Sequence, residues 1–166
     1  MNRDAKRAGQ RDETALTGDK KSGAALRGIE DALPIALLRT REEVMARFRP
    51  HLHQYDITEQ QWRVIRVLHT TKGTDATSLA SLCCILMPSL SRILKALEAR
   101  GLINRIKTPD DGRRQLIKLS DQGHDLFNAM WERSAEIYRE IEDECGKDLI
   151  EDVLDRLKHI QIALHT

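Results

Sequence analysis

One segment of the chain combines small polar and basic side chains at a spacing suited to nucleic-acid contact. The segment also carries an apolar stripe at helical spacing, which leaves the polar side chains on the opposite face. They are Ser89, Ser91, Arg92 and Lys95. Serine is small enough to let a helix backbone approach base edges, and the two cations can reach phosphates or a guanine edge. The pattern predicts a helix that lies in a DNA major groove.

A second basic pair, Arg113 and Arg114, lies in the stretch 108–114, which also contains a proline, two aspartates and a glycine. Alternating apolar residues flank this stretch, so it is predicted to be the tip of a β-hairpin. A tip that carries arginine can enter a minor groove, where the negative potential attracts cations. Each signal alone is also common in proteins that bind no nucleic acid, and it is their order along the chain that favours DNA binding.

Periodicity and capping signals predict the elements that position these residues. Helices are expected over about 34–55, 58–72, 75–83, 88–100, 120–145 and 147–165, with short strands over 102–107 and 115–119. Thr58 and Gln61 form a capping box, Asp75 and Ser120 are plausible helix caps, and Pro88 fits a first helical turn. The order predicts a winged helix-turn-helix within a mainly α fold (α+β winged helix).

Composition limits the classes of function. The formal net charge is only +1, so a nucleic-acid partner must be argued from where the charges lie. No stretch approaches the ~20 apolar residues of a membrane span, so no membrane partner is expected and the protein is expected in the cytoplasm. The chain shows no phosphate loop, nucleophile elbow or zinc-ligand spacing. We therefore expect no enzyme activity, no cofactor and no metal.

Residues 34–165 resemble the MarR family of bacterial transcription regulators. The likeness is carried by Leu79-Ala80, the segment 88–102, Asp111-Gly-Arg113, and Leu119-Ser120 followed by Gly123. Segments 35–38, 41–42, 48–50, 58–62 and 84–89 are most similar to the branch that regulates the breakdown of homoprotocatechuate and related aromatic acids. The chain departs from the family where Cys84 replaces a usual glycine, Leu86 a usual capping residue and Met87 an often basic residue.

The resemblance implies a ligand-responsive DNA-binding regulator, expected to repress an aromatic-compound catabolic operon. It implies a homodimer that binds double-stranded DNA at a roughly palindromic operator and is released by a small aromatic acid or its coenzyme A thioester. The implied parts are a helical dimerisation lobe (31–57 and 120–166) and a winged helix-turn-helix DNA-binding lobe (58–119). Residues 1–30 are predicted from their composition to be a disordered tail, because charged residues alternate there with glycine, serine and threonine and no apolar period is present.

The resemblance also suggests where the ligand binds. Arg41 lies where related regulators hold an aromatic carboxylate, and an ion pair with an acidic residue such as Glu42 is the alternative. His51, His53 and Tyr55 could bind phenolic oxygens in the same pocket, or they could be ordinary surface or interface residues.

Two other interpretations are open from the sequence. Cys83 and Cys84 lie in the turn before the predicted recognition helix, so their oxidation could misplace that helix in a redox-responsive regulator. A protein-interaction module that has kept the fold but lost DNA binding is a further alternative.

Overall fold

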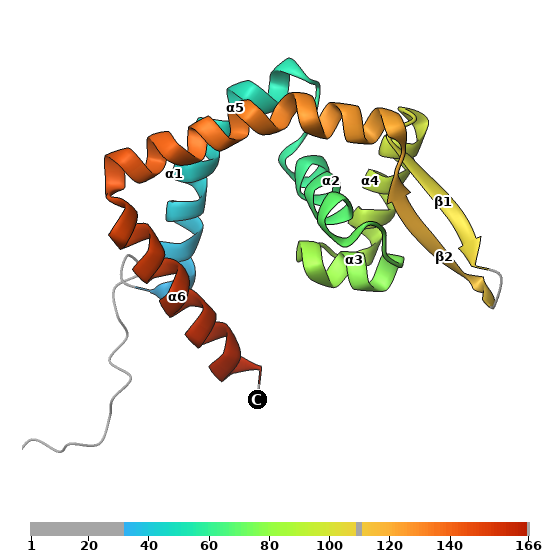
Figure 1. The fold of residues 1–166 in the computed structure, drawn as a ribbon. Helices are drawn as coiled ribbons and strands as arrows, with labels where there is room; N and C mark the ends of the chain where they lie inside the picture. Colours follow the sequence, from blue (N-terminus) through green and yellow to red (C-terminus); the bar gives the residue numbers. More distant parts are fainter. Residues whose placement is uncertain (1–31, 109–110, 166) are drawn as a thin grey trace, which may run out of the picture. The chain divides into compact units, whose positions relative to one another are not determined.

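The computed structural model describes residues 32–108 and 111–165, with the backbone alone for 107, 108 and 111–114 (Figure 1). The elements are α1 (Leu33–Gln54), α2 (Glu59–Thr71), α3 (Ala76–Cys83), α4 (Met87–Ala99), β1 (Ile103–Thr108), β2 (Asp111–Leu119), α5 (Asp121–Cys145) and α6 (Lys147–Leu164). The chain forms two compact units, one ending at Leu38 and one from Arg39 onward. The predicted order of elements and the mainly α class are confirmed. The predicted tail, residues 1–30, lies outside the described residues.

Local side-chain caps start the helices where the sequence predicts. The Thr58 hydroxyl accepts from the Gln61 amide at 3.2 Å, and the Thr58 amide donates to Gln61 Oε1 at 2.9 Å, which completes the capping box. Asp75 Oδ1 accepts from two amides of the first turn of α3. Ser120 Oγ accepts from the Gly123 amide at 3.0 Å at the start of α5. These bonds satisfy amides that a helix leaves without intrahelical partners.

Gly73 permits a close backbone approach between the end of α2 and the sheet. A Cβ atom there would lie 2.4 Å from Lys118 Cγ, and the residue has a φ of 113°. The chain then turns so that Thr74 pairs with Ile117, with backbone N–O distances of 3.0 and 2.9 Å. Because of this bridge, β2 is tied to the helical part of the winged helix as well as to β1.

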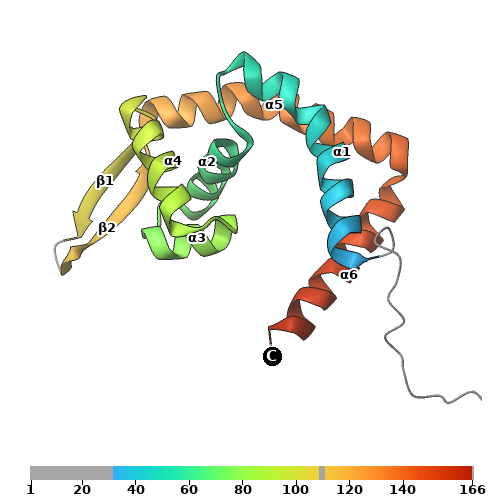
Figure 2. The same cartoon turned by 180° about the vertical axis from the view of Figure 1, so that it is seen from behind.

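The wing is an antiparallel hairpin of β1 and β2 that extends next to α4 (Figure 2). Its register runs from Ile103 opposite Leu119 to Thr108 opposite Asp111, with an irregularity after Lys107. Regular pairing ends at Lys107 opposite Gln115, as predicted, but both strands extend further toward the tip than predicted because Thr108 also pairs with Asp111 beyond the irregularity, which leaves residues 109–110 between them. Gly112, Arg113 and Arg114 therefore belong to β2.

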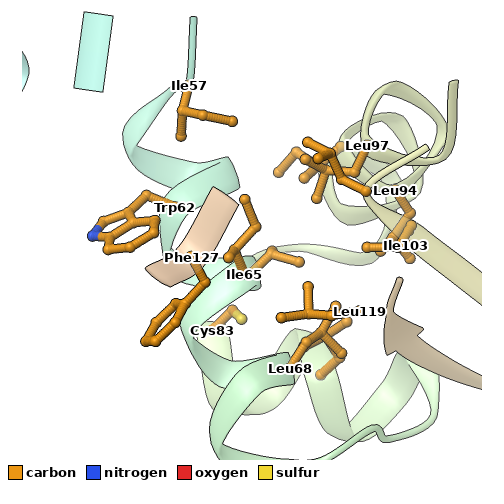
Figure 3. Packing of buried hydrophobic residues seen from close by; sticks show 14 of the residues in the cluster. Ile57, Trp62, Ile65, Leu68, Cys83, Leu94, Leu97, Ile103, Leu119 and Phe127 are labelled. Atoms are coloured by element: carbon orange, nitrogen blue, oxygen red, sulfur yellow. The ribbon is translucent and has the colours of Figure 1, made fainter. Parts of the chain in front are cut away.

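A single cluster of buried apolar residues joins α2, α3, α4, both strands and α5 (Figure 3). Its fully buried members include Ile65 and Leu68 of α2, Leu97 of α4 and Ile103 of β1. Figure 3 shows Trp62 and Phe127 at one side of this cluster, and their rings stack with centroids 5.6 Å apart. The core thus fixes α4 and leaves its outer face in solvent.

No single helix in the part of the chain that the structure describes is long and apolar enough to cross a membrane. Helices α3 and α4 reach the length and apolar composition of a membrane span only when they are taken together, and they are bent by 106° at the turn between them.

Candidate nucleic-acid interface and ligand cavity

A tight turn sets the angle between α3 and α4. The two helices are bent by 106° across it, within the range of helix-turn-helix motifs. Cys84 adopts the left-handed conformation with φ of 49°, and its amide donates to the Ser81 carbonyl while the Ile85 amide donates to the Ala80 carbonyl, both at 3.0 Å. These two bonds close the end of α3 as in a Schellman motif. Cys84 replaces the usual glycine of the family, and its Cβ atom makes the left-handed conformation less favourable than it is for glycine.

The four predicted contact residues of α4 lie away from the core. Leu90, Ile93, Leu94 and Leu97 are buried on its inner face. Ser91, Arg92 and Lys95 are exposed, and Ser89 is partly exposed. Arg92 and Lys95 form no ion pair with any residue that the structure describes. Two unneutralised cations on the outer face of this helix suit contacts with phosphates or base edges.

Two arginines hold the C-terminal half of α4. Arg100 donates to the carbonyls of Tyr55 and Asp56, which lie in the loop between α1 and α2. Arg105 of β1 places its Nε 3.0 Å from Glu98 Oε2 of α4. The helix is therefore positioned by polar contacts as well as by its apolar face.

Arg113 and Arg114 belong to β2 by their backbone, but their side chains lie outside what the structure describes. Their predicted contact with a minor groove stays a prediction.

A cavity of about 370 Å³ lies beside α2, with walls from α1, α2, α3 and α5. Its lining residues are Met45, Phe48, Glu59, Trp62, Arg63, Arg66, Val67, Thr70, Thr71, Leu82 and Tyr138. Most of its surface is apolar, with a few polar groups directed from α2 and α5. That composition is typical of sites for small organic ligands.

The polar groups of the cavity suit an aromatic anion. Arg66 donates to the Tyr138 hydroxyl at 2.6 Å, and its guanidinium carbon lies 5.5 Å from the Tyr138 ring centroid. The indole Nε1 of Trp62 is buried and has no hydrogen-bond partner among the described residues. Arg63 donates to the Cys83 carbonyl at 2.9 Å. Two cations, a phenol and a free indole N–H can together bind a carboxylate and a ring hydroxyl.

Glu59 joins this cavity to the predicted ligand residue Arg41. Its carboxylate accepts from Arg41 at 2.5 Å and from Arg49 at 2.6 Å, and both arginines also pair with Glu42. Burial opposes ionisation of Glu59, but the hydrogen bonds from Arg49 and Arg41 outweigh it and hold the pKa of its carboxyl below the usual value. Arg41 thus occupies the ion pair that was the alternative to ligand binding.

None of the four predicted ligand residues, Arg41 included, lines this cavity. His51 is buried, with Nε2 3.0 Å from the Met130 carbonyl of α5, and the Tyr55 hydroxyl donates to the Ala129 carbonyl at 3.3 Å. These contacts fix α1 on α5. His53 lines a separate cavity at the junction of α1 and α2. A ligand role for His51, His53 and Tyr55 stays a prediction.

The cysteines of the turn differ in environment. Cys83 is fully buried, and burial raises the pKa of its thiol, which disfavours the reactive thiolate. Cys84 is exposed, as is Cys145 at the end of α5. The buried thiol is therefore part of the core.

A scan of family models matches residues 57–114 to the MarR family. The chain is 41% identical over 138 residues to the HTH-type transcriptional regulator FarR of Neisseria gonorrhoeae. This match covers 81% of the chain and 94% of FarR. It is 42% identical over 114 residues to the homoprotocatechuate degradative operon repressor of Escherichia coli, with 69% of this chain and 77% of the repressor covered.

Two solved structures are similar over about four fifths of the chain. NadR in complex with 4-hydroxyphenylacetate has a TM-score of 0.71 and 40% identity, and the match covers 80% of this chain and 99% of NadR. The repressor CouR bound to a 23-mer DNA duplex has a TM-score of 0.68 and 27% identity, with 82% and 98% covered.

Fold and site define a winged helix-turn-helix protein with a ligand-sized cavity beside the helix pair. The chain belongs to the MarR family, and it is a transcription regulator and not an enzyme.

The cavity residues were not predicted from the sequence as ligand contacts: Trp62, Arg63, Arg66 and Tyr138. A signal was present on α2, where a tryptophan and two arginines recur at three- and four-residue steps beside the buried stripe. Tyr138 comes from α5, far along the chain, and no local pattern marks it.

Proposed function

We propose that this protein is a homodimeric repressor that binds a roughly palindromic operator and is released by a small aromatic carboxylate. The observation that carries the proposal is the cavity beside α2, where the Arg66 guanidinium, the Tyr138 hydroxyl and the unpartnered Trp62 indole N–H meet an apolar wall. A carboxylate pairs with the guanidinium, the ring packs on the apolar wall, and a phenolic oxygen accepts from the indole N–H.

The relatives support the chemical class of this effector. One of them is a repressor of a homoprotocatechuate degradative operon, and the solved structure of NadR contains 4-hydroxyphenylacetate. Both compounds are hydroxylated aromatic acids. Glu59 places Arg41 next to the cavity through their 2.5 Å ion pair, so Arg41 is a further candidate for the ligand carboxylate once it leaves Glu59.

Contact with DNA is assigned to the outer face of α4 and to the wing. Ser89, Ser91, Arg92 and Lys95 would lie in the major groove, with Arg113 and Arg114 at the adjacent minor groove. The exposed and unpaired state of Arg92 and Lys95 among the described residues supports this assignment, and so does the likeness to CouR, whose structure contains duplex DNA.

Dimerisation is assigned to the helical parts outside the winged helix, residues 31–57 and 120–166, with 58–119 as the DNA-binding lobe. In α6, which the structure describes throughout, no residue is buried, although Leu149, Val153, Leu154, Ile162 and Leu164 are apolar. A helix that exposes several large apolar side chains and buries none needs a partner surface. A second copy would place two α4 helices about one DNA turn apart. A DNA-binding regulator of this kind acts in the cytoplasm.

A titration of operator release tests the proposal. Purified protein is added to DNA from its own upstream region, and hydroxylated phenylacetates, benzoates, cinnamates and their coenzyme A thioesters are then added singly. We expect tight binding that a hydroxylated aromatic acid weakens at least tenfold, which corresponds to about 1.4 kcal/mol of differential affinity. Arg66→Gln should raise the concentration of effector needed. Tight binding that no compound of the panel weakens would contradict the assignment of the effector.

A further inference from the structure

Arg63 is the one described side chain that both lines the cavity and hydrogen-bonds the end of α3. Its Nη1 donates to the Cys83 carbonyl at 2.9 Å, and the contact is partly buried. Cys83 is the last residue of α3, and the turn to the recognition helix α4 follows immediately. The cavity and the helix-turn-helix therefore share one cation.

The contact with Cys83 satisfies a carbonyl that the helix itself leaves open. The final carbonyls of a helix have no intrahelical partners. The carbonyl of Ser81 accepts from the Cys84 amide and that of Ala80 from the Ile85 amide, and the carbonyl of Cys83 accepts from Arg63. A cation at a helix C-terminus is also favoured by the partial negative charge there. Arg63 thus caps α3 from the neighbouring helix α2.

The carboxylate of an anionic ligand that pairs with Arg66 through one oxygen would also compete for the Arg63 guanidinium, because both arginines line the cavity. A carboxylate forms a charge-assisted and often bidentate pair with arginine, which is stronger than a single hydrogen bond to a neutral carbonyl. Leu82, the residue before Cys83, also lines the cavity, so a bound ligand lies next to the turn itself. If Arg63 pairs with a ligand, its hydrogen bond to the Cys83 carbonyl is lost and α3 is no longer capped.

We propose that Arg63 is the positioning residue that couples the cavity to the recognition helix: an anionic effector draws its guanidinium from the Cys83 carbonyl, and the uncapped α3–α4 turn no longer holds α4 in its DNA-binding orientation. This inference rests on the proposed function, because it assumes an aromatic carboxylate in the cavity. It adds the route by which occupancy of the cavity lowers affinity for DNA. Effector and operator then bind with negative coupling, as differential affinity for two states requires.

The test compares Arg63→Gln with Arg66→Gln in the full chain. Arg66 lines the same cavity but donates to Tyr138 of α5 and not to α3, so it is the matched control. The operator dissociation constant is measured without ligand and with saturating 4-hydroxyphenylacetate, and calorimetry of each variant with this probe establishes the saturating concentration. The ratio of the two constants is the coupling.

We expect the wild type and Arg66→Gln to show the same coupling at saturation, with Arg66→Gln needing more probe. Arg63→Gln should bind the operator more weakly without probe and show a coupling below about threefold, against the 5- to 150-fold typical of allosteric proteins. Arg63→Lys keeps a cation and should restore part of the coupling. A residue that merely stabilised α3 would lower operator affinity in Arg63→Gln and leave the coupling unchanged, and that result would overturn the inference.

Hydrogen exchange of the wild type provides a second measurement, which decides the matter if Arg63→Gln does not fold or no longer binds the operator. Saturating probe should accelerate exchange of the Cys84 and Ile85 amides, which bond to the end of α3. Unchanged exchange at these amides overturns the inference and leaves the proposed function intact. A wild type whose operator affinity does not respond to 4-hydroxyphenylacetate or to the wider panel contradicts the proposed effector, and the inference with it.

Discussion

The winged helix from α2 to β2 and the last helix, α6, differ in how far they bury their apolar side chains. Leu68, Leu90 and Leu97 of the winged helix are at most 1% exposed. In α6, Leu149 is 56% and Leu154 53% exposed. The first region closes its own core, whereas the second keeps an apolar surface that a single chain does not cover. Stability of the fold should therefore depend on the winged helix, and oligomeric state on α6.

The largest effects should separate these two properties. Leu68→Ala removes a fully buried side chain of the shared core and should lower the free energy of unfolding by about 2–5 kcal/mol. Leu149→Asp places a charge on the exposed apolar surface and should shift dimer to monomer in analytical ultracentrifugation. Denaturant unfolding and sedimentation of both variants test the contrast. An unchanged dimer in Leu149→Asp, or a dissociated one in Leu68→Ala, would reverse the roles given to the two regions.

A second effect should appear where α5 packs on the winged helix. A Cβ atom at Gly123 would lie 2.1 Å from the Leu102 carbonyl oxygen, so the backbone must shift to admit it. Gly123→Ala should cost about 1–3 kcal/mol, although alanine favours helix. Gln122→Ala, on the exposed side of the same turn, is the control and should have little effect. Thermal unfolding measures both. Equal stability of the two variants would argue against tight packing at this junction.

A smaller effect should come from the ion-pair network of Arg41, Glu42, Arg49 and Glu59. Its members are partly exposed, so Glu59→Gln should cost about 1 kcal/mol at neutral pH. The lowered pKa of Glu59 means that its contribution is present above the ordinary glutamate pKa and is lost as pH falls through the folded-state value. Stability of Glu59→Gln should consequently fall less steeply than that of the wild type in acid. Parallel profiles of denaturant unfolding below pH 5 would exclude this role.

The smallest effect concerns His69 of α2, which stacks on Phe127 of α5 with ring centroids 3.7 Å apart. Burial, and then the neighbouring His124, lower the pKa of His69. A lowered histidine pKa means that the unfolded chain binds the proton more readily, so stability should decline as pH falls below about 6.5. His69→Gln should flatten this part of the profile. A wild type equally stable at pH 7.5 and pH 5.5 would contradict the expectation.

Sequence patterns predicted what depends on neighbouring residues. The capping box of Thr58, the cap at Asp75 and the start of α5 at Ser120 each need only a side chain and an amide two or three residues away. The added pair at the hairpin tip was missed because Thr108 pairs with Asp111 only after a shift in register, which no local pattern marks.

The ligand cavity was beyond such patterns. Its polar groups come from α2 and from Tyr138 of α5, 72 positions after the Arg66 to which it bonds. Arg41 was selected for its type and position, but its nearest carboxylates, Glu42 and Glu59, compete for it in the folded chain. Long-range packing decides which cation faces the cavity, and periodicity along one helix does not encode that choice.

The most direct test of the central claim is the salt dependence of operator affinity for the wild type and for Arg92→Ala, measured by fluorescence anisotropy on specific and scrambled duplexes. For a protein that places α4 in the major groove, we predict a steep loss of affinity with salt, tighter binding to the specific duplex and a slope reduced by about one in Arg92→Ala if that cation contacts a phosphate. If Arg92 contacts a base edge, the variant should instead lose preference for the specific duplex. Affinity that is independent of salt, with no preference between duplexes, would contradict the account.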